Sequence, residues 1–308
     1  MTATVDPAVA ALPARLANLR TGNGLALGAE TRHGVADVSA TAAAMGLDAP
    51  RDMDDLLRGH GVAAVRTVLD AADRDRSGIT LVPPAELRFA PLVTRPEKII
   101  CVGFNYREHA KETGTPIPDA PPLFSKFNNA LNHHEGEVRL PTRVAREFDY
   151  ETELVIVFGR ECRDVAAADA LDVVAGYATG NDLSARDLQT RTSQFLAGKC
   201  SDGFAPLGPW LVPANRVPDP NALWLRTTVN GEIRQDWTTR DMIHDCRRLI
   251  AFVSGIMTIR PGDILFTGTP QGVILGYGQP RDERPWLRAG DEVVSEIEGL
   301  GALRVTLA

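Results

Sequence analysis

The sequence predicts an α+β fold in which short β-strands dominate. Many short apolar runs are separated by turn residues, and the run at 223–229 leads into Asn230-Gly231. This dipeptide is the strongest short signal for a two-residue β-hairpin turn. The clearest long helical pattern is at 241–257. Many strands with few helices favour a mixed, mostly antiparallel sheet over a doubly wound one.

The remaining elements are predicted in order from residue 98 onward. A strand at 98–103 runs into a short helical pattern at 105–112, and the later elements are strands at 151–158, 173–179 and 264–267 and a terminal hairpin at 291–307. The long helix has an apolar face made of Ile243, Leu249, Ile250, Val253 and Met257. This spacing is typical of a helix that packs on a core.

Residues 1–95 are predicted to form a small N-terminal domain, with residues 96–308 as the catalytic domain. The first segment is rich in alanine and is expected to be helical at 7–20 and 53–72. Prolines near its end favour extended or turn backbone. The glycines of Gly22-Asn23-Gly24 do not have the spacing of a dinucleotide-binding loop, so this stretch is interpreted as a turn.

Composition and charge exclude several classes of protein. The 308 residues include 33 Lys and Arg against 40 Asp and Glu, a net charge of −7. Such a chain lacks the broad positive surface that a nucleic acid requires. The apolar runs are too short to cross a bilayer, no secretory signal begins the chain, and the four scattered cysteines indicate free thiols. We therefore expect a cytoplasmic protein without nucleic-acid or membrane partners.

Glu151 and Glu153 stand at the head of a predicted strand and are the first candidate metal ligands. Side chains two apart on a strand point to the same face, about 6.6 Å apart along it. Two such charges about 5 Å apart repel by roughly 3 kcal/mol at an effective dielectric of 20. A shared proton, basic partners or a cation must offset this repulsion. Carboxylate oxygens suit Mg²⁺, Mn²⁺ or Ca²⁺; the alternative is a solvated strand end.

Asp182 ends another predicted strand and is a third candidate ligand, with Asp149 and Asp187 as alternatives. Arg186 and Gln189 follow at i+4 and i+7, on one face of a helical turn. An arginine fork beside a metal suits a substrate that carries a carboxylate. The alternative is an ion pair of Arg186 with Asp182 or Asp187.

His109 and Glu112 lie three residues apart, hence on one face if their segment is helical. A carboxylate beside an imidazole raises its basicity and fixes its tautomer, which suits a general base acting on water. The pair His133-His134 has no zinc-binding spacing around it and is interpreted as part of a loop.

From residue 98 to the C-terminus, the chain resembles the fumarylacetoacetate hydrolase (FAH) family. The segments that carry this resemblance occur in the family's order: 103–112, 149–154, 181–187, the surroundings of Gly198-Lys199, 260–263 and 267–273. The resemblance implies an FAH-type mixed β-roll, usually a homodimer. It also implies that Mg²⁺ or Mn²⁺ is held by Glu151, Glu153 and Asp182.

The resemblance further implies the roles of the other candidates. His109 with Glu112 would be the water-activating dyad, on a segment that often orders as a lid. Substrate contacts would come from Lys199, Arg186, Gln189 and Thr269. The chain departs from the fumarylacetoacetate branch in lacking an additional metal-binding aspartate at 100–102, which favours an acylpyruvase-like branch with a water completing the metal shell. It also departs after Lys126, where many relatives have Lys-Pro and a glycine-rich turn.

The activity implied is hydrolysis of a C–C bond in a 1,3-diketo acid of the acylpyruvate or fumarylpyruvate type. The cation would act as a Lewis acid that stabilises an enolate, His109 would activate water, and Lys199 would stabilise the oxyanion. One alternative is an isomerase or decarboxylase of a 2-oxo or hydroxymuconate-type diacid in aromatic catabolism, which needs no nucleophilic water. Another is a non-catalytic relative that only binds a 2-oxo acid.

Overall fold

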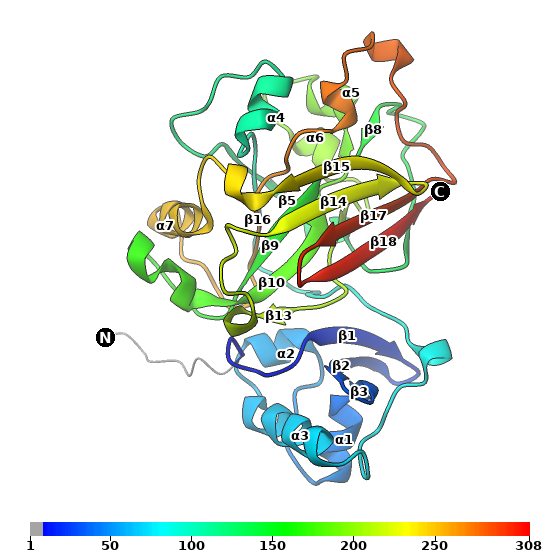
Figure 1. Cartoon of the computed structure of the whole chain (residues 1–308), viewed down its shortest axis with the longest axis vertical. Coiled ribbons are helices and arrows are strands. Elements are labelled where there is room, and N and C mark those ends of the chain that lie inside the picture. Colours follow the sequence, from blue (N-terminus) through cyan, green and yellow to red (C-terminus); the bar gives the residue numbers. More distant parts are fainter. Residues whose placement is uncertain (1–8) are drawn as a thin grey trace.

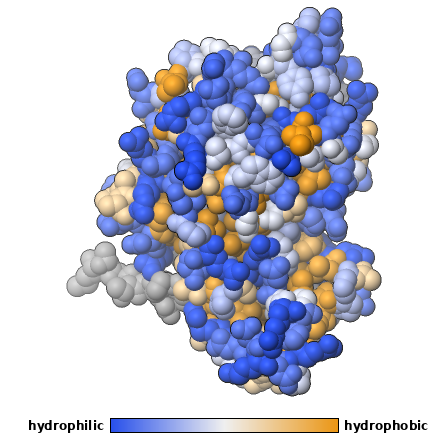
Figure 2. Space-filling view, viewed as in Figure 1, coloured by the Kyte–Doolittle hydropathy of each residue, from blue (hydrophilic) through white to orange (hydrophobic). Residues whose placement is uncertain are grey.

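The computed structural model describes residues 9–308 and has an α+β architecture, as the sequence predicts. A small N-terminal lobe, blue to cyan in Figure 1, lies against a larger body that contains two main sheets. On the face seen in Figure 2, hydrophilic residues dominate and hydrophobic residues form scattered patches. Within residues 9–308, no helix has both the length and the apolar character needed to cross a membrane.

The N-terminal lobe is an antiparallel sheet with three helices. Its strands β1 (Leu16–Thr21), β2 (Gly24–Thr31) and β3 (Gly34–Asp37) pair in the order β1-β2-β3. The helices are α1 (Val38–Ala44), α2 (Met53–Leu57) and α3 (Val62–Arg74). The helix predicted at 53–72 is divided at Gly59 and Gly61, whose φ angles of 90° and 65° interrupt an α-helix.

The helix predicted at 7–20 is wrong over its described part. From Leu16 onward the chain forms β1, which pairs with β2 through the turn at Gly22-Asn23 and bonds to Leu211 of the body. Leu16 and Leu19 are buried in this arrangement. Pairing and burial therefore override the helix propensity of the alanines, leucines and arginines in this stretch. Residues 7 and 8 of the predicted helix lie outside the described residues.

The larger body contains a six-stranded mixed sheet that carries the site. Its order is β13 (Val212–Pro213), β10 (Val174–Asn181), β9 (Thr152–Phe158), β16 (Ile264–Phe266), β4 (Ile99–Val102) and β5 (Leu123–Lys126). Only the β16–β4 pair is parallel. Strand β9 is buried along its whole length. This explains its nearly continuous apolar sequence.

A five-stranded sheet packs beside it (Figure 1). Its order is β15 (Glu232–Thr238), β14 (Trp224–Val229), β17 (Glu292–Ile297), β18 (Gly301–Leu307) and β7 (Gly136–Val138). The β14–β15 hairpin turns at Asn230 and Gly231, with φ of 52° and 83°. The two hairpins predicted from the sequence are confirmed.

Short elements complete the body. Strand β8 (Phe148–Asp149) pairs with β11 (Ser184–Ala185), and β6 (Leu131–Asn132) pairs with β12 (Ala205–Pro206). The helices are α4 (Arg107–Glu112), α5 (Arg186–Gln189), α6 (Leu196–Lys199) and α7 (Cys246–Ile256). Helix α7 begins five residues later than predicted, because the side chain of Asp245 caps its N-terminus by accepting from Arg248 N–H.

One apolar cluster joins the lobe to the body. Leu16 and Leu27 of the lobe belong to the same buried cluster as Val155 and Phe266 of the large sheet. On the other face of that sheet, a second cluster includes Leu249 and other residues of α7. The division of the chain near residue 95 into two domains stays a prediction.

Candidate active site

Seven of the nine predicted site residues line one small cavity in the body. The cavity has a volume of about 90 Å³. The seven are His109, Glu151, Glu153, Arg186, Gln189, Lys199 and Thr269. The other two are adjacent to this set: Asp182 is fully buried beside the glutamates, and Glu112 contacts His109. Residues from five separate stretches of the chain thus meet at one place.

The three acidic candidates form a compact, buried trio. One carboxylate oxygen from each of Glu151, Glu153 and Asp182 lies within 4.8 Å of the others. Strand pairing brings them together: Glu153 of β9 faces Gly180 of β10, and Asp182 N–H donates to the carbonyl of Glu151 at 2.9 Å. Because all three side chains are buried, the alternative of a solvated strand end is wrong.

Two lysines neutralise part of this charge. Lys199 Nζ donates to Glu151 at 2.6 Å and to Asp182 at 2.7 Å. Lys126 Nζ lies 2.6 Å from the other oxygen of Asp182 and donates to the carbonyls of Leu183, Lys199 and Phe204. Lys126 was missed as a site residue in the sequence analysis. Its position at the end of a strand, with Phe124 and Phe127 on either side, is the signal that could have found it.

Arg186 is held in a buried network of ion pairs. It donates to Asp149 at 2.8 Å, to Glu151 at 2.7 Å and to Gln189 at 2.9 Å. The alternative that pairs Arg186 with Asp182 or Asp187 is therefore wrong, because its carboxylate partners are Asp149 and Glu151. Asp149 also accepts the N–H groups of residues 274 and 275, which commits it to the fold. Asp187 accepts from main-chain N–H groups and lies outside the trio.

Burial and neighbouring charges shift the pKa values of Glu151 and Glu153 in opposite directions. Burial raises the pKa of Glu153 well above its usual range, and the negative charges of Asp182 and Glu151 raise it further. Burial also opposes ionisation of Glu151, but Arg186 and Lys199 more than offset this and hold its pKa below the usual range. Glu153 accepts one hydrogen bond, from Gly268 N–H at 2.7 Å.

This donor set fits a divalent metal. Four carboxylates, those of the trio and Asp149, face three cations, Lys126, Arg186 and Lys199, so one negative charge is left over. Ionised, Glu153 would carry this excess, because it is the member of the trio without a basic partner; its raised pKa reflects the cost of that charge. A hard cation bound by three carboxylate oxygens would remove this imbalance.

The predicted dyad is present at the edge of the cavity. His109 Nδ1 lies 3.3 Å from Glu112 Oε2 on α4, and the other oxygen of Glu112 accepts from Gly272 N–H at 2.9 Å. Helix α4 is anchored to a distant segment, because Asp241 accepts from Glu108 N–H at its first turn. These contacts fix the direction of the imidazole.

Aromatic side chains form the remaining wall. Phe195 meets both Phe104 and Phe124 edge to face, with ring centroids 6.1 and 5.6 Å apart. Lys199 Nζ lies over the ring of Phe124, 5.2 Å from its centroid. The cavity is therefore lined both by charged groups and by aromatic rings, and Lys199 contacts both.

Thr269 is placed in the cavity, but its hydroxyl is already engaged. It donates to the carbonyl of Thr152 at 2.9 Å and accepts from the amide of Gln235 at 2.9 Å. Gln235 was also missed by the sequence analysis. A lone buried glutamine four residues after an Asn-Gly turn gave only a weak signal.

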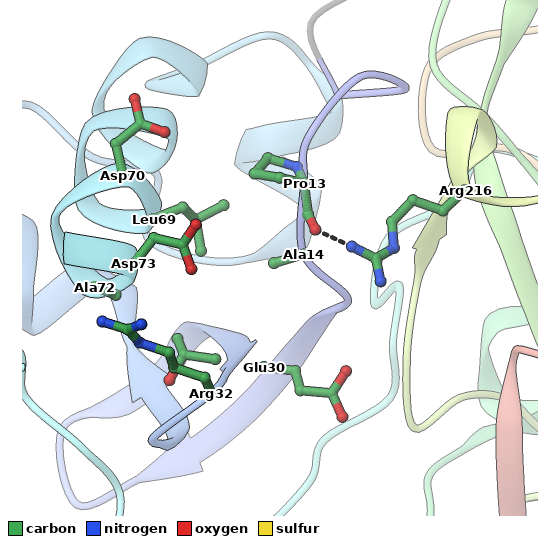
Figure 3. A pocket seen from close by; sticks show the side chains of 10 residues that line it. Pro13, Ala14, Glu30, Arg32, Leu69, Asp70, Ala72, Asp73 and Arg216 are labelled. Carbon is green, nitrogen blue, oxygen red and sulfur yellow. Dashed lines mark hydrogen bonds between the residues drawn. The ribbon is translucent and has the colours of Figure 1, made fainter.

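A larger, open cavity lies between the N-terminal lobe and the body (Figure 3). It has a volume of about 430 Å³, and its charged lining residues are Glu30, Arg32, Asp70, Asp73 and Arg216, all exposed. Arg216 donates to the carbonyl of Pro13. Because its charged side chains are exposed to solvent, this cavity lacks the cluster of buried charges that lines the smaller one.

Residues 98–308 match the family model described as the C-terminal domain of fumarylacetoacetate (FAA) hydrolase. The chain belongs to the fumarylacetoacetate hydrolase family. The site described above lies wholly within the matched part, and the sheet-rich fold is that of FAH enzymes, as the resemblance implied.

Several FAH relatives are similar over most of their length. Human mitochondrial oxaloacetate tautomerase FAHD2A is 43% identical over 227 residues, which are 73% of this chain and 71% of the relative. The structure of maleylpyruvate hydrolase from Sphingobium sp. SYK-6, in complex with manganese(II) and pyruvate, has a TM-score of 0.76 at 32% identity, covering 96% of this chain and 98% of that one. The 5-carboxymethyl-2-hydroxymuconate delta-isomerase of Mycobacterium smegmatis has a TM-score of 0.71 at 32% identity, with the same coverages.

Proposed function

We propose that the protein is a divalent-metal-dependent enzyme that moves a proton between carbon and oxygen of a small 2-oxo acid, with oxaloacetate as the first candidate substrate. The single observation that carries this is that His109, paired with Glu112, lines the same cavity as Glu151 and Glu153 of the carboxylate trio. The high identity to oxaloacetate tautomerases supports the choice of substrate. This ranks tautomerisation above the hydrolysis that the sequence favoured.

The residues divide the proton transfer between them. Glu151, Glu153 and Asp182 would hold Mg²⁺ or Mn²⁺, which when bound polarises the 2-oxo group and favours negative charge on its oxygen. His109, oriented by Glu112, takes the proton from the carbon next to the oxo group. Lys199 uses two N–H groups on carboxylates, so its third can donate to the substrate oxygen. Returning the proton to that oxygen completes conversion to the enol.

The lining of the cavity suits a small acid. Arg186 and Lys199 supply positive charge, and Phe104, Phe124 and Phe195 supply apolar surface. Tautomerisation needs only proton transfer, so His109 can serve it without a bound nucleophilic water.

Hydrolysis of a C–C bond in an acylpyruvate is the second candidate. The same dyad could activate a water, and a structural neighbour is named a maleylpyruvate hydrolase. Binding of a 2-oxo acid without catalysis is the third. A homodimer and a cytoplasmic location stay proposals that accompany these activities.

One experiment separates the three candidates. Metal-loaded protein is mixed with the enol form of oxaloacetate, and its ultraviolet absorbance is followed against metal alone and against the Glu151→Ala variant. The same preparation is given acetylpyruvate, with release of pyruvate measured by a coupled assay. Faster ketonisation of oxaloacetate supports the proposal. Release of pyruvate from acetylpyruvate, with no effect on oxaloacetate, supports hydrolysis. Neither activity, with oxalate binding seen by calorimetry, would support the third candidate.

A further inference from the structure

Gln235 stands at the centre of a buried polar network behind the carboxylate strand. Its Oε1 accepts from Thr152 N–H at 3.2 Å and from the Thr227 hydroxyl at 2.6 Å. Its Nε2 donates to the Thr269 hydroxyl and to the carbonyl of Pro270, both at 2.9 Å. The side chain is 1% exposed. One carboxamide thus connects β15, the strand that bears the glutamates and the loop that bears Thr269.

A β-bulge explains why Gln235 points inward. In the β14–β15 pair, Thr227 faces Gln235 but the next residue, Thr228, faces Ile233, so Arg234 is the extra residue. A bulge bends a strand and re-aims a side chain. The carbonyl of Arg234 also leaves no room for a Cβ on Gly272, whose φ is +96°. The loop at 269–272 therefore packs directly on the bulge.

The network fixes the main chain between the two glutamates. Thr152 is the residue between Glu151 and Glu153, and its N–H and carbonyl are bonded to Gln235 and Thr269. The N–H of Glu151 donates to Asn181 Oδ1 at 3.0 Å. Since β9 begins at Thr152, these side chains hold main-chain groups at the very start of the strand. They determine where both carboxylates are directed.

We infer that Gln235 is a positioning residue for the metal carboxylates. Its carboxamide sets the peptide between Glu151 and Glu153 and, through Thr269, couples that peptide to the substrate side of the cavity. Partners that orient ligands from outside the coordination shell commonly change metal affinity by roughly 10- to 100-fold when removed. The inference rests on the divalent metal of the proposed function but not on its substrate.

The test compares Mn²⁺ affinity in variants without any substrate present. Gln235→Met fills the same space but lacks every polar contact, and we expect its Mn²⁺ dissociation constant, from electron paramagnetic resonance, to rise roughly 10-fold or more. Gln235→Glu keeps the shape and the acceptor for Thr152 N–H but loses the amide that donates to Thr269 and Pro270, so it should recover only part of the lost affinity. Gln279→Met makes the same Gln-to-Met substitution at an exposed position and should bind Mn²⁺ like the wild type.

A second variant separates positioning from general stability. Thr227→Val removes a hydroxyl from the same buried network but leaves the contacts of Gln235 with Thr152 and Thr269. We expect it to lower the melting temperature with Mn²⁺ affinity within about threefold of the wild type. If Gln235→Met does not fold, Gln235→Asn, whose amide is one methylene shorter, takes its place with the same expected loss.

Two results would overturn the inference. One is Mn²⁺ binding by Gln235→Met, or by its Asn replacement, that equals the wild type. The other is an equal loss of affinity in Thr227→Val, because the network would then act only through stability. Absence of tautomerase activity in a wild-type protein that binds Mn²⁺ would instead contradict the proposed function and leave this comparison intact.

Discussion

Gly276 leaves space for the carboxylate of Glu112. A Cβ built on Gly276 would lie 2.5 Å from Glu112 Oε2 and closer still to its Cγ and Cδ. Glu112 is the group that faces His109 Nδ1, so this glycine makes room for half of the dyad. The φ of Gly276 is outside the left-handed region, so an alanine there would be strained by contact and not by its backbone.

Gly276→Ala should displace Glu112 and lower kcat by roughly 10-fold or more, because a misplaced imidazole loses much of its value as a base. Mn²⁺ affinity should stay unchanged, since the trio is not touched. Gly278→Ala is the matched control, because no atom lies within 4 Å of a Cβ at that exposed glycine. Equal kcat values for the two variants would contradict the role given to Glu112.

His109→Gln should remove the activity while leaving the metal site intact. General acid–base groups contribute roughly 100- to 10,000-fold to rate, and His109 makes no contact with the three carboxylates that an amide would break. Glu151→Ala, in contrast, removes a ligand together with the partner of Lys199 and Arg186. Turnover with calorimetric Mn²⁺ titration separates the two: a normal rate in His109→Gln would make the assignment of the base wrong.

The sequence contained enough information for the site but not for its neighbours. Glu151, Glu153 and Asp182 could be grouped because each ends or begins a strand, and strand ends meet where the strands pair. The sequence could not reveal that Arg186 bonds to Asp149, since that contact depends on where the short β8–β11 pair folds. Lys126 and Gln235 were missed for the same reason: most of their partners, including main-chain groups, lie far away in sequence.

The error in the predicted secondary structure comes from local propensity, which tertiary pairing overrides. The segment ending at residue 20 has the composition of a helix, yet it becomes a strand because its apolar residues are buried against β2 and Leu211. Such tertiary pairing outweighs propensities of a few tenths of a kcal/mol per residue. The hairpin at Asn230-Gly231 was predictable because its positive φ angles are encoded in the two turn residues themselves.

Glu153→Gln should stabilise the metal-free protein while weakening metal binding. The pKa of Glu153 in the folded protein is raised above its ordinary value of 4.5, chiefly by burial. Below pH 4.5 both folded and unfolded chains carry the proton; above it the unfolded chain loses it first, so the free energy of unfolding falls as pH rises. Glutamine has no proton to lose, so the free energy of unfolding of this variant should exceed that of the wild type by an amount that grows as the pH rises above 4.5.

Urea unfolding of chelator-treated protein between about pH 5 and pH 8 measures this difference. Mn²⁺ affinity of the same variant should fall roughly 10-fold or more, because an amide oxygen replaces a carboxylate. Glu296→Gln, an exposed change elsewhere on the sheet, should alter neither quantity. A Glu153→Gln protein that is less stable than the wild type at pH 7 would show that Glu153 is ionised and favourably paired without metal.

Arg186→Met should lower the free energy of unfolding far more than the same substitution in an exposed ion pair. The guanidinium bonds to Asp149 and Glu151 with only 2% of its side chain exposed, and removing one member of a buried ion pair leaves charges unpaired at a cost of about 3–5 kcal/mol. Arg226→Met, which breaks a half-exposed pair with Asp236, should cost about 0.2–1 kcal/mol. Urea unfolding of both variants tests this. A stable Arg186→Met protein with only a raised KM would support the substrate-binding role that the family resemblance implies and would show that the ion-pair network contributes little to the stability of the fold.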